Sequence, residues 1–465
     1  MGATETLSRF IVDTKYDDIS EEALRLSKRL FLDWLGTCIA GSAEEGGRII
    51  TEYTREIGGA PQARVVVSGD MTSVANAAFA NGTLGHILDY DDTGFSHPTA
   101  CIAPALLALG EKQNVTGKEA CTALVVAYEA FEHLSLAARP YERVVRHRGY
   151  HPTSLYGTLA AAACGSKLLD LDVQQTRRAF GLAASQASGL SQNFGTWAKG
   201  FHAGNAARGG VLAAILASKG YFADEEAIEG DHGFFHAIHT EGNYDISKVT
   251  ENLGDPWSIV SPGLTIKGYP CCGGNLRALD AALAIVNQNG LKYDDIESLA
   301  VECHPDLLDT LRFRKPTIAF NGKFSLDYNM AAAIVFGGVN IDSFRQEVAD
   351  DPRMRDAMEN RIQVIEHPEW TRADMAQGNP VTITTKDGRK FTNTVAHPKG
   401  HPQNPLSQEE LREKFRYCTG RVPLAGDQVK RLIDLVENLE SVDDIGQVLE
   451  ATAAAVAVQG NGGGS

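Results

Sequence analysis

Hydrophobic residues recur at helical spacing through roughly the first half of the chain. Between residues 21 and 39, apolar side chains follow one another every three or four positions, and Gly41 then marks a stop. Further segments of helical length, rich in Ala, Leu and Gly, are expected at about 46–57, 72–90, 100–112, 117–138, 151–168, 173–193 and 203–219. Because small residues let helices approach closely, this pattern predicts a compact all-helical region.

The pattern changes near residue 260, where apolar residues begin to alternate with a period of two. Residues 296–303 and 361–365 are expected to form strands, and two alternating runs within 381–395 flank Asp387-Gly388, which is typical of a hairpin turn. Helices are expected between these strands and again beyond them, at about 273–288, 325–336, 343–358 and 407–456.

Helices at both ends of the chain with an α+β segment between them predict a mainly α protein. We expect a large discontinuous all-helical domain and a smaller α+β lid domain. The helical domain would comprise residues 1–265 and the returning helices of 400–458, and the lid residues 266–399. The glycine-rich residues 459–465 are expected to be a disordered tail.

Composition narrows the classes of function. The chain is 43% hydrophobic and 22% charged, as soluble globular proteins are, and no apolar run approaches the length of a membrane span. A net charge of −16 argues against nucleic-acid and anionic-membrane partners, but a small anionic substrate would respond to a local basic pocket instead. Eight cysteines without Cys-x-x-Cys spacing, and a start without a secretory h-region, indicate reduced thiols and a cytoplasmic location.

Residues 82–98 carry the densest set of chemically active side chains. His86 and Asp89 are three apart and would share a helix face, which Thr93 joins if the helix continues for another turn. Pro98 disfavours the α conformation at His97, so a loop imidazole would lie beside the helix end. A carboxylate, a hydroxyl and an imidazole together can perform general acid–base catalysis. The alternative is a solvated helix end without function.

Four further residues are candidates, each with a structural alternative. His151 precedes a helix and could belong to a simple capping loop. Lys199 lies in a glycine-broken stretch before a helix, where it could bind a carboxylate or be solvated. Lys267 stands at the junction with the lid, and Tyr328 begins a lid helix as a proton donor or a buried core residue.

Metal and thiol chemistry have weaker support. A hard cation could be held by a set of four side chains, namely Asp89, Asp91, Asp92 and His97. However, neither a His-Glu-x-x-His pattern nor a thiolate spacing is present, and no glycine-rich nucleotide motif follows a strand, so we expect no metal and no cofactor. Cys271 and Cys272 are interpreted as packing residues, because no neighbouring base can be placed for a nucleophile.

Four segments in this order resemble the MmgE/PrpD family, which includes 2-methylcitrate dehydratase, cis-aconitate decarboxylase and iminodisuccinate epimerase. They are residues 82–98, Tyr150-His-Pro-Thr-Ser154, Lys199-Gly-Phe-His-Ala-Gly-Asn205 and Lys267-Gly-Tyr-Pro-Cys-Cys272. The resemblance extends over about residues 5–455. It implies a helical domain with an α+β lid, a homodimer, no metal or organic cofactor, and an active site in the cleft between the domains.

The resemblance also implies a site lined by Asp89, Thr93, His97, His151, Lys199, Lys267 and Tyr328. In that site the two lysines would bind substrate carboxylates, His97 and His151 would exchange protons, Asp89 would orient a histidine, and Tyr328 would donate a proton. We assign substrate binding to Thr93, Lys267, His86 and His202.

The expected activity is therefore that of a cofactor-independent lyase that dehydrates or decarboxylates a small polycarboxylate. Three alternatives remain open at this point: an epimerase of an iminodisuccinate-type substrate, a non-catalytic polycarboxylate-binding homologue, and a hydrolase that uses Cys271 or Cys272. The segment between Asp89 and His97 looks shorter than in mammalian cis-aconitate decarboxylases. The Cys-Cys-Gly-Gly-Asn run differs from the mammalian decarboxylases and from the bacterial methylcitrate dehydratases. The identity of the substrate is therefore not decided by the resemblance.

Overall fold

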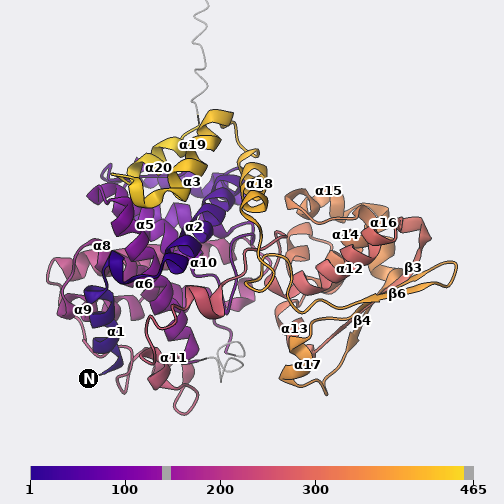
Figure 1. Cartoon of the computed structure of the whole chain (residues 1–465), viewed down its shortest axis with the longest axis horizontal. Helices are drawn as coiled ribbons and strands as arrows, with labels where there is room; N and C mark the ends of the chain where they lie inside the picture. Colours follow the sequence, from indigo (N-terminus) through magenta and orange to yellow (C-terminus); the bar gives the residue numbers. More distant parts are fainter. Residues whose placement is uncertain (1, 139–147, 455–465) are drawn as a thin grey trace, which may run out of the picture.

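A computed structural model describes residues 2–138 and 148–454 of the chain. Two bodies of unequal size lie side by side: a larger helical domain and a smaller domain that combines helices with a sheet (Figure 1). This arrangement confirms the expected mainly α fold with an α+β lid. The tail expected at 459–465 lies outside the described residues. Within the described ranges, no helix is both long and apolar enough to span a bilayer.

The helical domain is built around α10 (Ala198–Ser218), which packs along α4 (Val74–His86) and α8 (Pro152–Leu168). Glycines permit this close contact, since a Cβ added to Gly82 would lie 2.8 Å from the Gly204 Cα. The surrounding helices are α1 (Ala3–Asp13), α2 (Glu21–Gly41), α3 (Glu45–Ile57), α5 (Thr99–Gln113), α6 (Gly117–Leu136), α9 (Val173–Ala184) and α11 (Phe234–His239). Two short strands, β1 (Ala63–Arg64) and β2 (Met71–Thr72), pair antiparallel at its edge.

The chain returns to the helical domain at its C-terminal end. There α18 (Gln408–Thr419) packs on α2, and α19 (Gly426–Glu437) packs on α2 and α20 (Gly446–Thr452), as the yellow and indigo ribbons of Figure 1 show. Buried side chains from both parts of the chain, residues 7–266 and 411–451, form one hydrophobic cluster. The helical domain is therefore discontinuous in sequence, as expected.

The lid has a hydrophobic cluster of its own, drawn from residues 271–383. Its sheet has the order β4 (Ile362–Glu366), β3 (Ile296–Cys303), β5 (Val381–Thr385), β6 (Lys390–Asn393), with β3 and β4 parallel and the other pairs antiparallel. The main lid helices are α12 (Leu276–Gln288) and α14 (Leu326–Phe336), accompanied by the short α13 (Pro305–Thr310) and α17 (Arg372–Ala376). Gly388 has a φ of +87°, which confirms the expected hairpin turn between β5 and β6.

Several expected helix ends are wrong. The helix expected to reach residue 90 ends at His86, and Asp89 has a left-handed φ of +52°. His86, Asp89 and Thr93 therefore share no helix face. The helix expected at 343–358 is divided into α15 (Gln346–Ala349) and α16 (Pro352–Asp356), because Pro352 cannot continue a preceding helix. The helix expected to reach residue 193 ends at Ala184. The returning C-terminal segment forms the helices α18, α19 and α20.

Candidate active site

The loop between α4 and α5 passes directly beside the segment that enters the lid. Thr93 and Thr265 exchange two backbone hydrogen bonds of 2.8 Å, so the loop is paired with the junction that carries Lys267. Lys199 enters from the first turn of α10, and His151 stands immediately before α8. Four separate elements thus converge on one buried place.

The Lys199 ammonium is the centre of this cluster. Its Nζ lies 2.9 Å from the Asp89 Oδ1, 2.9 Å from the His86 Nε2 and 3.3 Å from the His97 Nε2. An ammonium has three protons to donate, and these three acceptors take all of them. Lys199 is only 5% exposed, so its charge is balanced by protein groups rather than by water.

The partners of the two histidines determine which nitrogen carries the proton. The His97 Nδ1 lies 2.7 Å from the backbone oxygen of Asp92, which can only accept, so this Nδ1 is protonated and the Nε2 has a free lone pair. The His86 Nδ1 lies 2.8 Å from the Asp91 Oδ1. Burial would raise the pKa of Asp91, but His86 and two lysines hold it below its usual value, so the carboxylate accepts and the His86 Nε2 faces Lys199 as a lone pair.

Asp89 joins Lys199 to a second buried lysine. The Lys267 Nζ donates to the Asp89 Oδ1 at 2.5 Å and to its backbone oxygen at 2.9 Å. Burial alone would raise the pKa of Asp89, but Lys199 and Lys267 hold it well below its usual value. The Asp89 Oδ2 is buried and has no hydrogen-bond partner among the described residues. One carboxylate thus bridges two cations and keeps an unused acceptor.

The histidines of the cluster are neutral at neutral pH. Burial first, and then the Lys199 charge, lowers the pKa of His97 and of His151 well below its ordinary value. Burial lowers the pKa of His202 to about 4, and the His202 Nδ1 lies 3.0 Å from the His151 Nδ1. Neutral imidazoles can accept a proton, and protonated lysines nearby can supply one.

The donor set considered for a metal ion is already occupied by a protein cation. Ligand atoms of His86, Asp89, Asp91 and His97 lie within 4.8 Å of one another. Three of these residues accept hydrogen bonds from Lys199, so its ammonium stands where a metal ion would bind. The residues present therefore do not fit a metal ion while Lys199 holds this position. Asp92 was also expected in this set, but it is not among the residues whose ligand atoms lie together. It is buried, and burial together with the nearby Asp91 charge raises its pKa.

Two expected site residues lie apart from the Lys199 cluster. Tyr328 is buried in the lid core, where its hydroxyl donates to the Ser343 backbone oxygen at 2.6 Å and its ring stacks on Phe344. This placement matches the structural alternative of a buried core residue. Thr93 is half-buried, and its Oγ1 would lie 3.2 Å from a Cβ added to Gly273. Its side chain therefore faces the segment leading into the lid.

The structure adds two buried lysines that sequence reasoning missed. Lys323 in the lid donates to the backbone oxygens of Leu88 at 2.8 Å and Pro270 at 2.6 Å, and burial lowers its pKa to about 8. Lys414 on α18 forms an ion pair with Asp33 at 2.6 Å. A lysine between Gly322 and Phe324, ahead of an apolar helix, was the one sequence signal available; Lys414 lies in a charged helix and gave none.

The cysteines offer no activated thiol. Cys271 is fully buried and Cys272 is partly exposed, and burial raises the pKa of both above the ordinary value. Thiols that stay protonated are poor nucleophiles, which argues against the hydrolase alternative.

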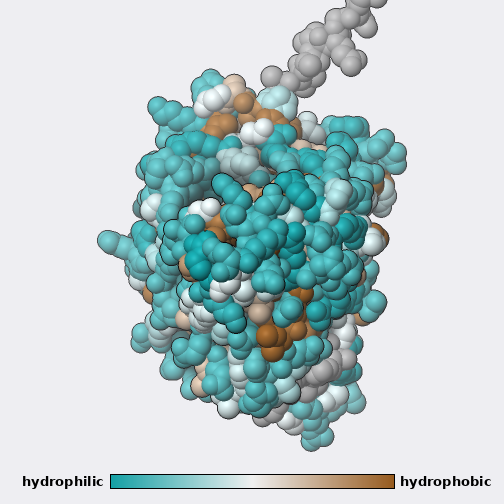
Figure 2. All heavy atoms as spheres, turned by 90° about the vertical axis from the view of Figure 1, so that its right-hand side faces the viewer, coloured by the Kyte–Doolittle hydropathy of each residue, from teal (hydrophilic) through white to brown (hydrophobic). Residues whose placement is uncertain are grey.

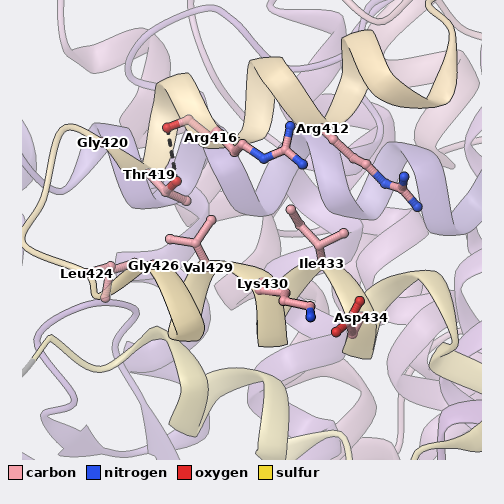
Figure 3. Close-up of a pocket in the computed structure, with 10 residues that line it drawn as sticks. All are labelled: Arg412, Arg416, Thr419, Gly420, Leu424, Gly426, Val429, Lys430, Ile433 and Asp434. Carbon is pink, nitrogen blue, oxygen red and sulfur yellow. Dashed lines mark hydrogen bonds between the residues drawn. The ribbon is translucent and has the colours of Figure 1, made fainter.

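A groove of about 570 Å³ lies elsewhere, between α18 and α19 (Figure 3). Arg412 and Arg416 extend over it from α18, while Val429 and Ile433 face it from α19. Its arginines are already paired, Arg412 with Glu437 and Arg416 with Glu409, both at 2.6 Å. The charges of these two arginines are therefore balanced within the protein.

A helical domain, an α+β lid and a buried cluster of lysine, histidine and aspartate side chains where the two meet define the class of this protein. Comparison with known proteins gives the class a name. The sequence profile of the MmgE/PrpD N-terminal domain matches residues 5–247, and that of the C-terminal domain matches residues 269–441. The chain belongs to the MmgE/PrpD family, as its motifs indicated.

Three relatives illustrate its position in the family. The cis-aconitate decarboxylase of Homo sapiens is 28% identical over 454 residues, covering 95% of this chain and 92% of the relative. The cis-aconitate decarboxylase of Aspergillus terreus is 26% identical over 479 residues, covering 97% and 95%. The mitochondrial 2-methylcitrate dehydratase of Yarrowia lipolytica is 23% identical over 462 residues, covering 90% and 84%.

Proposed function

We propose that this protein is a lyase that acts on a small polycarboxylate by moving a proton at a carbon next to a carboxylate. The observation that carries the proposal is the Asp89 carboxylate bound between the Lys199 and Lys267 ammonium groups. Two buried cations with one shared counter-ion form a site to which further carboxylates are attracted. The relatives are named a cis-aconitate decarboxylase and a 2-methylcitrate dehydratase, and both names specify a small polycarboxylate as the substrate.

For a cis-aconitate-type substrate the chemistry needs charge stabilisation and one acid. The carbon–carbon bond to a carboxylate breaks, carbon dioxide leaves, and the electron pair spreads onto the neighbouring carboxylate as an enolate-like group. Lys199 and Lys267 stabilise that developing charge at short range. A proton then reaches the carbon from Lys199, either directly or through His97, whose Nε2 lies 3.3 Å from the Lys199 Nζ.

Dehydration of a 2-methylcitrate-type substrate is the second candidate, supported by the Yarrowia lipolytica relative. This reaction needs a base for the carbon proton and an acid for the departing hydroxide. The neutral His97 or His151 would be the base, and protonated Lys199 the acid. We rank decarboxylation first because the decarboxylases are more similar to this chain, and epimerisation third because neither reported activity is of that kind.

Substrate entry requires the lid to move. Lys267 is fully buried and Lys199 nearly so, and they reach the cluster from the lid junction and the helical domain respectively. Binding energy from a polycarboxylate that contacts both lysines would favour the closed arrangement that the structure shows. The site needs no metal in this account because lysine ammonium groups supply the positive charge.

We further propose a homodimer that forms through the helical domain. Exposed apolar side chains gather there on α3 and α10, and edge-to-face ring contacts through the buried Phe79 link Tyr53 to Phe201. The exposed members include Ile49, Tyr53, Ile57 and Phe201. The side of the molecule that bears the lid is mostly hydrophilic, with only small separate apolar patches (Figure 2). An apolar face of this kind is typical of a subunit interface. The buried or partly buried free cysteines support a cytoplasmic location.

The test of the reaction is proton NMR in deuterated water with cis-aconitate, 2-methylcitrate, citrate and an iminodisuccinate. Loss of carbon dioxide or water identifies the lyase and names its reaction. Deuterium exchange next to a carboxylate without net loss would replace the lyase with the epimerase. Thermal stabilisation by these anions without exchange or turnover would contradict catalysis and indicate a binding protein.

A further inference from the structure

Three consecutive backbone oxygens around Asp89 each accept a hydrogen bond from a different buried lysine. The oxygen of Leu88 binds the Lys323 Nζ at 2.8 Å, that of Asp89 binds the Lys267 Nζ at 2.9 Å, and that of Tyr90 binds the Lys414 Nζ at 2.8 Å. All three lysines are less than one-tenth exposed. A buried ammonium is costly to desolvate, so three of them on one stretch of backbone need a reason beyond packing.

Two of these lysines also hold the segment that enters the lid. Lys323 donates to the Pro270 oxygen at 2.6 Å, and Lys414 donates to the Lys267 oxygen at 2.9 Å. Each ammonium therefore joins the Asp89 loop to the chain that carries Lys267. Lys323 belongs to the lid and Lys414 to the returning helix α18, so the two reach the loop from different domains.

The loop needs such support because Asp89 adopts an unfavourable backbone conformation. Its φ of +52° lies in the left-handed region, which is unfavourable for a residue other than glycine. A relaxed loop would withdraw the Asp89 Oδ1 from the 2.9 Å contact with the Lys199 Nζ. Charge-assisted hydrogen bonds to the flanking carbonyl groups are strong enough to offset that cost.

From this geometry we infer that Lys323 and Lys414 are positioning residues: they fix the Asp89 loop against the lid junction, so that the Asp89 carboxylate lies between Lys199 and Lys267 when the lid is closed. The inference rests on the proposed function for its catalytic consequence, but not for its structural one. Neither residue contacts the reacting groups directly. Lys323 acts through the backbone oxygens of Leu88 and Pro270. Lys414 acts through those of Tyr90 and Lys267. Lid closure and the assembly of the cation pair become one event, because the bond from Lys323 to Leu88 exists only when the domains meet.

The experiment compares two variants with a matched control. Lys323→Met removes the lid-side bonds. Lys414→Met is combined with Asp33→Asn, because Asp33 would otherwise become a buried carboxylate without its partner. The control is Lys167→Met, since the partly buried Lys167 also donates to a backbone oxygen, that of Val12 at 2.8 Å, away from the cluster.

We expect each test variant to lose about 10-fold to 100-fold in kcat with KM changed by less than about twofold, as small misplacements of catalytic groups do. The control should keep wild-type kcat. Crystal structures of the variants should show Asp89 out of the left-handed region and its Oδ1 withdrawn from Lys199. Wild-type kcat in a folded Lys323→Met protein, or an unmoved Asp89, would overturn the inference.

The structural and kinetic results separate this inference from the proposed function. If the wild-type protein converts none of the polycarboxylates, the lyase assignment fails, and the position of Asp89 in the variant structures alone decides about the two lysines. If the Lys414→Met/Asp33→Asn protein does not fold, Lys323→Met decides, because no carboxylate lies within ion-pair distance of Lys323 among the described residues.

Discussion

The Lys199 Nζ lies 2.9 Å from the His86 Nε2, and this contact attaches the central ammonium to a buried chain of groups that ends on the Asp91 carboxylate. The hydrogen bond to Asp91 holds His86 in one tautomer, so that Lys199 is the donor in its contact with the His86 Nε2. The same ammonium faces the Nε2 of His97, which the backbone of Asp92 fixes in the same way. Lys199 therefore has two imidazole lone pairs with which to exchange a proton, in addition to its carboxylate partner.

Asp89→Asn should retain the shape of the site and lose its charge balance. Asp89 is a main influence that raises the pKa of Lys199 against the lowering effect of burial, so the amide would lower the pKa of Lys199 further. We expect kcat to fall by about 100-fold or more. Steady-state kinetics with the substrate found by NMR provides the measurement.

Asp327→Asn is the matched control for that variant. Asp327 is a buried carboxylate that pairs with Arg314 at 2.6 Å within the lid. Its replacement should lower thermal stability and leave kcat within about twofold of wild type. Equal losses of kcat in both variants would mean that Asp89 has only a structural role.

His97→Asn should separate the two nitrogens of this imidazole. The amide can still donate to the Asp92 oxygen, as the His97 Nδ1 does, but it has no counterpart of the Nε2 that faces Lys199. A general acid–base group contributes about 10²- to 10⁴-fold, so we expect a loss of kcat in that range.

His239→Gln serves as its control. His239 is another buried histidine, whose pKa burial lowers to about 4, but its Nε2 lies 3.1 Å from the Tyr156 hydroxyl and not at the Lys199 cluster. This variant should lose stability without losing turnover. A His97→Asn enzyme as active as His239→Gln would remove His97 from the mechanism.

Stability should fall on acidification because of the depressed histidines. The pKa of His202 is about 4 in the folded protein and about 6.5 in an unfolded chain. Between these values the unfolded state binds more protons, so the free energy of unfolding decreases as pH falls from 6.5 towards 4. His202→Gln should reduce that slope by about 1.4 kcal/mol per pH unit at most.

Urea unfolding at several values of pH between 4.5 and 7 measures this slope. His236→Gln, which removes an exposed histidine, is the control and should leave the slope unchanged. A His202→Gln protein with the wild-type slope would show that His202 is not held in its neutral form.

The proposed dimer predicts that charge on α10 disrupts assembly. Phe201 is 43% exposed on the apolar face shared with α3, so Phe201→Glu would place a carboxylate in the interface. Sedimentation velocity should show dimers for wild type and monomers for the variant. Ile318→Glu, on the exposed surface of the lid, should remain dimeric; monomeric wild-type protein would contradict the proposal.

The sequence predicted the mainly α fold with its α+β lid because hydrophobic periodicity reports burial directly. The strand expected at 296–303 was placed correctly, and the hairpin at Asp387-Gly388 followed from its turn residues. The cluster was harder to predict. His86 and Asp89 both contact the Lys199 ammonium. They do so because Asp89 has a left-handed conformation in a loop, and not because they share a helix face. Spacing alone cannot reveal that conformation.

The sequence also did not predict the direction in which some side chains point. Tyr328 had the sequence context of a site residue, yet its hydroxyl binds a carbonyl group within the lid. Lys414, more than 300 residues from Asp89 in sequence, reaches the backbone beside it. Contacts of this kind depend on how distant helices pack, and no local pattern in the chain records them.

The most direct test of the account is a proton NMR time course with cis-aconitate in deuterated water, run on wild-type protein and on Lys199→Met. Lys199 binds Asp89, His86 and His97 at once, so its removal should abolish turnover while the protein remains folded. We predict loss of carbon dioxide with wild type and none above background with the variant. Equal conversion by both proteins would contradict it.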